Sequence, residues 1–245
     1  MAGITGWTGR AVADAVRSAD DLELAAGVSR SDPASFSSVA EALDAATVDL
    51  LVDYTHADAV KGHVVAALDR GVGVVIGSSG LTSEDYEEID ALAREREAGV
   101  VAAGNFSLTA ALVLRFATEA GRHLDAWEIV DYASHGKPDA PSGTSREIAE
   151  RLDELRGPAV AVPVERTLGA PEARGARIGG SQVHSLRLPS FTVSTEVIFA
   201  GAGERLSLRH DAGESPAPYV AGTLLAIRAV PTRIGLTRGL DRLLD

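Results

Sequence analysis

The first part of the chain alternates short apolar runs with segments that have helical spacing. Four apolar runs are short enough to be buried strands: Leu22–Val28, Val48–Tyr54, Val72–Ile76 and Gly99–Ala103. Three other segments have helical patterning, one before the first run and two between later runs: Val12–Ser18, Asp58–Arg70 and Glu84–Glu97. Because parallel strands need crossover connections, this alternation predicts a parallel sheet with helices on both faces.

After residue 107 the pattern changes. A long helix is expected at Leu108–Leu124. The elements after it are a strand at Trp127–Ala133, a helix near Ser145–Leu155, and strands at Gln182–Leu188, Phe191–Phe199 and Arg205–His210. Short turns between the last strands are typical of antiparallel pairing, so we predict an α+β unit with a mixed sheet. The apolar stretch Tyr219–Val230 predicts a helix that returns to the first unit.

Charge and cysteine content exclude several classes of partner. The formal net charge is −12, which argues against nucleic acid or an anionic membrane surface as the main partner. No cysteine occurs, so disulfides and thiolate metal sites are excluded, and we expect no metal centre. No apolar run reaches membrane-spanning length and no signal pattern opens the chain, so we expect a cytoplasmic protein.

A glycine-rich turn opens the chain. Gly3, Gly6 and Gly9 are spaced by three residues directly before a helical pattern. Glycines let the backbone approach a pyrophosphate at the positive end of the following helix. We therefore predict a dinucleotide site that also includes the intervening and flanking residues Thr5, Trp7, Thr8 and Arg10. The alternative is a glycine turn that holds no ligand.

The residues before this turn are few. Only Met1 and Ala2 precede Gly3, whereas a strand that leads into such a turn needs about five residues. We therefore expect a truncated first strand, or a natural start upstream of this methionine.

Other predicted strand ends carry small polar residues, where open α/β sheets bind ligands. Ser29 and Arg30 stand where a carboxylate usually holds the ribose hydroxyls, so the pattern favours a 2′-phosphate, although an ordinary surface arginine is the alternative. Further candidates for the cofactor site are Tyr54, Thr55, Gly77, Ser78 and Ser79. These last positions are also compatible with plain strand-to-helix turns.

The segment from His135 to Thr144 contains the most specific pattern. Two prolines restrict a loop that includes Lys137, one of only two lysines among the 23 basic residues. We expect Thr144 to cap the next helix in a capping box with Glu147. The amides of Ser142, Gly143 and Thr144, with the Lys137 ammonium, would then bind a carboxylate. A purely structural capped loop is the alternative.

These motifs resemble the dihydrodipicolinate reductase family over nearly the whole chain. The matching segments are Gly-x-x-Gly-x-x-Gly-Arg at 3–10, Val-Asp-Tyr-Thr-His at 52–56, Gly-Ser-Ser-Gly at 77–80, Gly-Asn-Phe-Ser at 104–107, Lys-Pro-Asp-Ala-Pro-Ser-Gly-Thr at 137–144, and Ile-Phe-Ala-Gly-x-Gly-Glu-Arg at 198–205. The resemblance implies a Rossmann-like nucleotide domain at residues 1–106 and 215–245. Residues 107–214 would form the domain for substrate binding and tetramerisation.

The resemblance also implies a reaction. Members of the family reduce 4-hydroxy-tetrahydrodipicolinate to tetrahydrodipicolinate with NADPH or NADH, on the route to diaminopimelate and lysine. It implies a small cyclic dicarboxylate-like substrate, a homotetramer, and roles for Asn105 and Phe106 at the cofactor and for Lys137 at the substrate. Ser29 and Arg30 favour NADPH over NADH.

The chain departs from the family pattern at the expected proton donor. The family usually has two adjacent histidines where this chain has Ala133 and Ser134, and an alanine cannot transfer a proton. His135 lies close by, so it is the candidate for a displaced acid, against an ordinary loop histidine. The alternatives are a paralogue that reduces another cyclic imine or enamine carboxylate, and a nucleotide-sensing protein that has lost catalysis.

Overall fold

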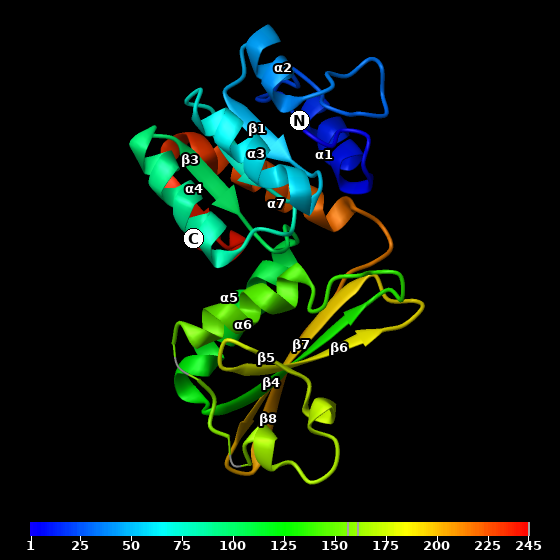
Figure 1. Ribbon diagram of the computed structural model, residues 1–245, viewed down its shortest axis with the longest axis vertical. Coiled ribbons are helices and arrows are strands. Elements are labelled where there is room, and N and C mark those ends of the chain that lie inside the picture. Colours follow the sequence, from blue (N-terminus) through cyan, green and yellow to red (C-terminus); the bar gives the residue numbers. More distant parts are fainter. Residues whose placement is uncertain (156, 161, 245) are drawn as a thin grey trace. The chain divides into compact units, whose positions relative to one another are not determined.

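The computed structural model describes residues 1–155, 157–160 and 162–244. The chain divides into two compact units, one formed by Met1–Leu108 and Pro216–Asp245 and the other by Thr109–Ser215 (Figure 1). These boundaries fall beside the ones expected at residues 106–107 and 214–215. The α/β class with one parallel and one mixed sheet is confirmed.

The first unit is built on sheet A, which consists of parallel strands in the order β1-β2-β3-β9. Its strands are β1 (Leu50–Asp53), β2 (Gly73–Ile76), β3 (Gly99–Ala102) and β9 (Gly235–Arg238). Its helices are α1 (Trp7–Arg17), α2 (Val39–Ala45), α3 (Ala57–Leu68), α4 (Ser83–Glu95) and α7 (Ala217–Ala229). Short 3₁₀ segments follow at Val230–Thr232 and Leu240–Leu243. Helices α3 and α4 lie side by side over this sheet, and α1 packs on α7 (Figure 1).

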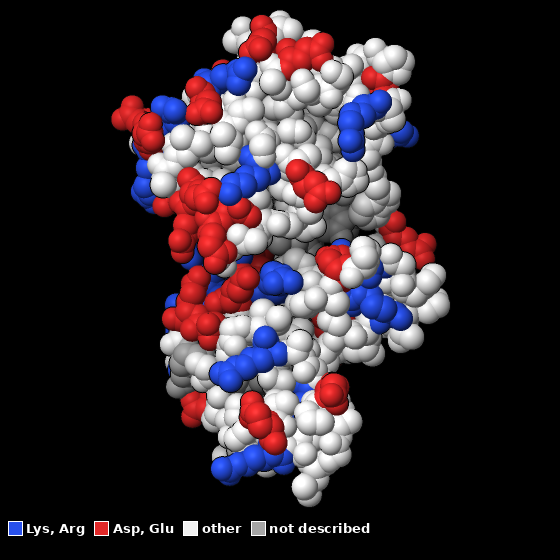
Figure 2. Space-filling view, viewed as in Figure 1, with Lys and Arg blue, Asp and Glu red and all other residues white. Residues whose placement is uncertain are grey.

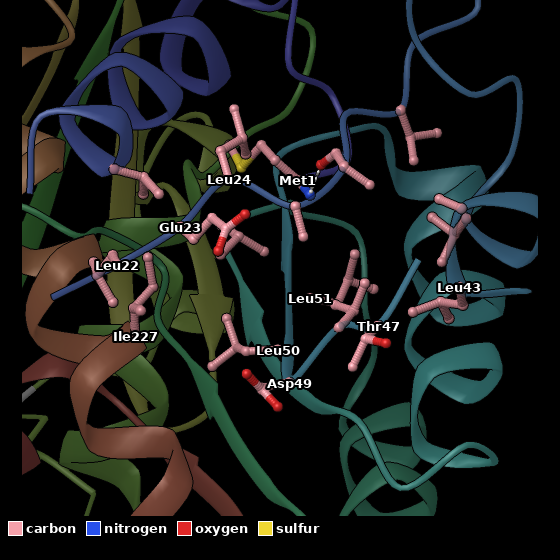
Figure 3. A pocket seen from close by; sticks show the side chains of 18 of the residues that line it. Met1, Leu22, Glu23, Leu24, Leu43, Thr47, Asp49, Leu50, Leu51 and Ile227 are labelled. Atoms are coloured by element: carbon pink, nitrogen blue, oxygen red, sulfur yellow. Dashed lines mark hydrogen bonds between the residues drawn. The ribbon is translucent and has the colours of Figure 1, made fainter. Parts of the chain in front are cut away.

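The N-terminal edge of sheet A differs from the prediction. Leu22–Val28 is not a strand: only Val28 forms isolated bridges, one of them to Ala2, which also bridges Asp53. A cavity of about 290 Å³ lies beside this segment, between it and β1 (Figure 3). Most of Leu22–Val28 therefore lacks a neighbouring backbone with which to form a ladder. The Met1 amino group bonds the carbonyl of Ala26 at 2.9 Å, and burial lowers the pKa of this amino group to about 6.

The second unit is built on sheet B, with the order β5-β6-β4-β7-β8. Its strands are β4 (Ala126–Ala133), β5 (Ala176–Ile178), β6 (Ser181–Arg187), β7 (Val193–Gly201) and β8 (Glu204–Asp211). Strand β4 runs parallel to β6 and antiparallel to β7. Two helices, α5 (Leu108–His123) and α6 (Gly143–Asp153), supply side chains to the core of this unit. Short 3₁₀ segments lie at Val164–Arg166 and Pro171–Arg174.

Strand β4 explains how sheet B meets its helices. Buried residues alternate with partly exposed ones along it, and the buried set is Trp127, Ile129, Asp131 and Ala133. Trp127 and Ile129 belong to the apolar core with residues of α5 and α6. Asp131 therefore places a carboxylate in an otherwise apolar stripe, directly beside the start of α6.

The capping prediction for α6 is wrong in register. Ser142, not Thr144, is the N-cap residue, and the helix begins at Gly143. The Ser142 side chain makes no capping bond, because its hydroxyl donates to Asp131 instead. A capping box does occur in α4, where Thr82 and Asp85 bond one another's backbone amides.

On the face that Figure 2 shows, acidic and basic side chains are interspersed, and acidic ones gather over α4. That helix contains Glu84, Asp85, Glu87, Glu88 and Asp90. Because this face has no broad basic surface, an anionic ligand needs local donors.

No helix within the described residues is long and apolar enough to cross a membrane.

The buried His210 predicts a pH-dependent stability. Its Nδ1 lies 3.1 Å from the Thr109 hydroxyl, and burial lowers its pKa from 6.5. Below pH 6.5 the unfolded chain takes up a proton on this residue that the folded chain resists. We expect the free energy of unfolding to fall as pH drops through this range, and His210→Gln to lose that part of the dependence. Chemical denaturation at about pH 7.5 and about pH 5.5 measures it.

The matched control is the exposed His123. His123→Gln should keep the pH dependence of the parent chain. If the free energy of unfolding changed equally with pH in the two variants, His210 would not contribute to the pH dependence.

Candidate functional site

The glycine turn of the first unit needs glycine for steric reasons. Gly3 has a φ of 76°, and a Cβ there would collide with the carbonyl of Tyr54. A Cβ at Gly9 would collide with the carbonyl oxygen of Gly3. The amide of Gly6 donates to that same carbonyl at 2.9 Å. The turn is therefore closed tightly against the end of β1.

Helix α1 starts directly at this turn and offers backbone donors. Its first intrahelical bond runs from Arg10 N to Gly6 O at 3.0 Å, so the amides of Trp7, Thr8 and Gly9 point out of the helix N-terminus. Trp7 is half exposed and contacts Tyr219 edge to face. Amides at a helix N-terminus, beside a backbone that no Cβ crowds, fit a pyrophosphate.

Hydroxyl groups gather where the adenosine ribose of a dinucleotide is expected. The Oγ atoms of Thr5 and Ser29 lie 2.8 Å apart, and Ser31 Oγ lies 3.1 Å from Ser29 Oγ. Arg30 is exposed beside them. The nearest following carboxylate, Asp32, accepts from Ser35 and Ala34. These side chains offer donors that an anion could accept, and Ser31 belongs to the group although no sequence motif indicated it.

A buried carboxylate organises the ends of β1 and β2. Asp53 accepts from the Thr55 hydroxyl at 2.7 Å and from Ser78 Oγ at 2.6 Å, and it lies 2.7 Å from His63 Nδ1. Burial alone would raise the pKa of Asp53, but the bonds from His63, Ser78 and Thr55 together lower it below its ordinary value. Two predicted cofactor residues, Thr55 and Ser78, are thus held in place by Asp53.

Aromatic side chains lie next to this carboxylate. Tyr54 packs edge to face with Phe106, and its hydroxyl is 2.6 Å from Thr223 Oγ1. The ring also lies against Gly77, where a Cβ would collide with it. Burial raises the pKa of Tyr54, so it is a neutral phenol. Ser79 is exposed, and Asn105 Oδ1 accepts from Ser107 N at 2.8 Å.

In the second unit the segment from His135 to Ser142, called the Lys137 loop below, leads into α6. The first intrahelical bond of α6 is donated by Arg146 N, so the amides of Gly143 and Thr144 point out of the helix N-terminus. Lys137 Nζ pairs with Asp139 Oδ1 at 2.8 Å. Lys137 N also donates to Ser134 O, and His135 is exposed in the turn between them. Lys137 therefore lies in the segment that leads into α6, and Gly143 and Thr144 lie in the first turn of that helix.

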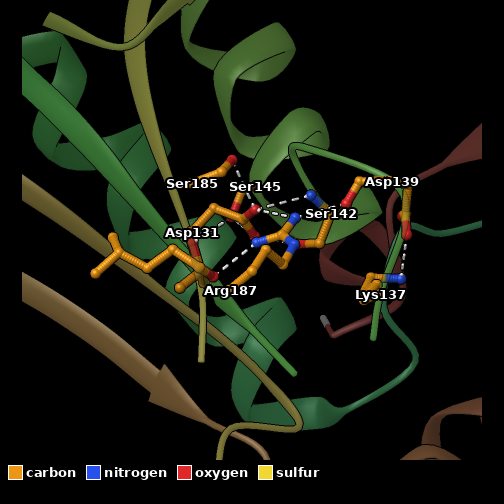
Figure 4. Close-up of polar contacts among 9 residues, drawn as sticks. Asp131, Lys137, Asp139, Ser142, Ser145, Ser185 and Arg187 are labelled. Atoms are coloured by element: carbon orange, nitrogen blue, oxygen red, sulfur yellow. Dashed lines mark hydrogen bonds and ion pairs between the residues drawn. The ribbon is translucent and has the colours of Figure 1, made fainter. Parts of the chain in front are cut away.

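Ser142 has a different environment from the other predicted substrate residues. It is 1% exposed, and both its amide and its hydroxyl donate to Asp131, at 3.1 and 2.5 Å. Arg187 donates to Asp131 at 2.9 Å and to the carbonyl of Asp139 at 2.6 Å (Figure 4). Burial alone would raise the pKa of Asp131, but the bonds from Ser142, Arg187 and Ser185 lower it below its ordinary value.

Family models match both units of the chain. The model described as "Dihydrodipicolinate reductase, N-terminus" matches residues 1–106, and the one described as "Dihydrodipicolinate reductase, C-terminus" matches residues 109–244. The chain belongs to the dihydrodipicolinate reductase family. The resemblance stated from the motifs is confirmed.

Individual relatives agree with this assignment. A 4-hydroxy-tetrahydrodipicolinate reductase of Mycobacterium marinum is 36% identical over 244 residues, which covers 99% of this chain and 97% of the relative. One of Nocardia farcinica is 36% identical over 246 residues, covering 99% and 96%. A dipicolinate-bound dihydrodipicolinate reductase from Paenisporosarcina sp. TG-14 has a TM-score of 0.80 at 28% identity and covers 99% of this chain and 97% of that one.

Several residues of the site were not selected from the sequence. Asp53 stood inside a quoted motif, but nothing local indicated that it would hold both Thr55 and Ser78. His63 and Thr223 come from helices distant in sequence, and their contacts depend on tertiary packing. Asp131 had a signal: it shares the odd-numbered positions of the apolar strand pattern around Trp127.

Two glycine-to-alanine changes test the turn. Gly9→Ala should weaken NADPH binding by more than about tenfold, because the new Cβ forces the Gly3 carbonyl and the helix start apart. Gly62→Ala in α3 meets no atom within 4 Å, so it should keep NADPH affinity and raise stability by up to about 1 kcal/mol. Calorimetric titration and thermal unfolding measure both. Native affinity in Gly9→Ala would remove the turn from the cofactor site.

Proposed function

We propose that this chain is an NAD(P)H-dependent reductase that converts 4-hydroxy-tetrahydrodipicolinate to tetrahydrodipicolinate in diaminopimelate and lysine biosynthesis. The observation that supports it most is the Lys137 loop, a segment with an ammonium that leads directly into the N-terminus of α6, in a chain that also has a tight glycine turn. Relatives that carry this activity in their names cover almost the whole chain.

The first unit binds the cofactor, which when bound supplies a hydride. The α1 amides and the glycine turn hold the pyrophosphate. Thr5, Ser29 and Arg30 receive a 2′-phosphate, because they supply hydroxyl and guanidinium donors and Ser29 follows Val28 in place of a carboxylate. NADPH is therefore preferred, and NADH is also used. Tyr54 and Gly77 lie near the ends of β1 and β2, with the buried Phe106 packed against Tyr54, and we assign the nicotinamide to this place.

The second unit binds the substrate, a small cyclic dicarboxylate. The Paenisporosarcina relative contains dipicolinate, which has two carboxylates on a planar ring. Lys137 and the amides of Gly143 and Thr144 hold one carboxylate of the substrate. Ser142 supports this site from behind, since both of its donors are used by Asp131. His135 is the candidate for the proton donor, in the turn that also contains Lys137.

A second candidate function follows from Ala133 and Ser134. With no histidine at either position, the chain is also compatible with a paralogue that reduces another cyclic imine or enamine carboxylate. By family membership we assign the active protein to the cytoplasm as a homotetramer, and light scattering can measure the assembly.

Coupling the chain to purified dihydrodipicolinate synthase tests the reaction. NADPH absorbance should fall steadily with the wild-type chain. Lys137→Ala should lower kcat and raise the substrate KM, each by about tenfold or more, while NADPH affinity stays unchanged. Lys137→Arg should recover only part of the lost kcat and substrate affinity, because a planar guanidinium does not reproduce the geometry of an ammonium.

His135→Ala is the contrast to these variants. A large fall in kcat with unchanged KM assigns proton delivery to His135, and an unchanged kcat assigns it to water or to the substrate. Near-native kinetics in Lys137→Ala would contradict the carboxylate site. Absence of turnover in the wild-type chain would favour the paralogue.

Arg30→Ala tests the cofactor preference. The KM for NADPH should rise by about ten- to a hundredfold, since a lost charged hydrogen bond costs about 1.5–3 kcal/mol. The KM for NADH should stay within about twofold, because NADH lacks the 2′-phosphate. Equal losses for both cofactors in steady-state assays would exclude Arg30 from the 2′-phosphate site.

A further inference from the structure

The carboxylate of Asp131 is fully buried and receives hydrogen bonds from three different parts of the second unit. Ser142 at the end of the Lys137 loop donates from both its amide and its hydroxyl. Ser145 in α6 donates at 3.1 Å. Strand β6 contributes Ser185 at 3.0 Å and Arg187 at 2.9 Å (Figure 4). One side chain of β4 therefore fixes the end of the loop, the first turn of α6 and the neighbouring strand.

Arg187 extends this connection to the loop itself. The same Nη2 atom that bonds Asp131 also donates to the backbone carbonyl of Asp139 at 2.6 Å. The side chain of Asp139 pairs with Lys137. A chain of contacts thus runs from the buried carboxylate to the ammonium that we assign to the substrate.

The charges matter as much as the geometry. A carboxylate behind the N-terminus of α6 lies in the same positive field that a bound anion would use. Left alone, Asp131 would repel a substrate carboxylate at that helix end. Arg187, whose side chain is 18% exposed, pairs with Asp131 at 2.9 Å and neutralises this charge.

The ion pair between Asp131 and Arg187 is not one that stability by itself would favour. Arg187 Nε is buried and has no hydrogen-bond partner among the described residues. Buried ion pairs contribute little net stability, and an unsatisfied donor reduces it further. A role in the binding site accounts for a pair that packing does not need.

We propose that Asp131 and Arg187 are positioning residues for the substrate: Asp131 fixes the Lys137 loop against α6, and Arg187 cancels the Asp131 charge so that the helix N-terminus accepts a carboxylate. This inference rests on the proposed function, since it assumes that the loop binds an anionic substrate.

Three variants separate charge compensation from simple structural support: Arg187→Met, Asp131→Asn, and the double variant. Arg187→Met leaves an uncompensated carboxylate behind the anion site, so it should raise the substrate KM by about tenfold or more in the coupled assay. The KM for NADPH should stay within about twofold, because the cofactor site belongs to the other unit. The double variant has neither charge, and its substrate KM should be at least about threefold lower than that of Arg187→Met.

A matched control comes from another arginine–carboxylate pair whose carboxylate also belongs to β4. Arg174 donates to Glu128 at 2.6 Å from the opposite face of β4. Arg174→Met should leave the substrate KM unchanged. Thermal unfolding of every variant, and calorimetric binding of dipicolinate, report stability and anion affinity independently of turnover.

The outcomes distinguish the inference from the proposed function. No turnover by the wild-type chain contradicts the proposed function. Wild-type turnover combined with a double variant that binds substrate no better than Arg187→Met contradicts charge compensation. A rise in substrate KM in Arg174→Met equal to that in Arg187→Met, or an equal rise in the NADPH KM, reduces the pair to general structural support.

Discussion

The buried carboxylate of Asp131 is the interaction on which the arrangement of the Lys137 loop, α6 and β6 in the second unit depends. A charge in an apolar core is strongly unfavourable unless donors surround it. Here the donors come from Ser142, Ser145, Ser185 and Arg187, so satisfying one charge brings the loop, the helix and strand β6 together. The position of Lys137 is a consequence of this requirement, because its loop is anchored at both Asp139 and Ser142.

The first unit uses the same device with different residues. Asp53 is also fully buried at the end of a strand, and it gathers Thr55, Ser78 and His63 around the ends of β1 and β2. The adjacent glycine turn adds a backbone constraint, since neither Gly3 nor Gly9 has room for a Cβ. In each unit a buried carboxylate therefore orders the segments next to it.

The pattern of apolar and polar residues predicted most elements, because buried positions recur with the period of the helix or strand that contains them. Strand β4 alternates over its full length, and α5 lies within one residue of its expected bounds. The strand predicted at Leu22–Val28 does not form, because a strand needs a backbone partner and an apolar pattern does not encode one. Strands β5 and β9 were missed because both are short and only partly buried. The register of the α6 cap was missed because Asp131, eleven residues away, takes the hydroxyl that would otherwise cap the helix.

The pairing of Lys137 with Asp139 limits what the lysine can contribute to substrate binding. The ammonium has three N–H donors, so a carboxylate can share it with Asp139, whose ion pair is partly exposed. Because Asp139 already offsets part of the positive charge, the added attraction is smaller than an unpaired lysine would give. The amides of Gly143 and Thr144 cannot be satisfied within α6, so the helix N-terminus and the ammonium can hold the proposed carboxylate together. We therefore expect substrate affinity to depend on Lys137 and on the start of α6 jointly.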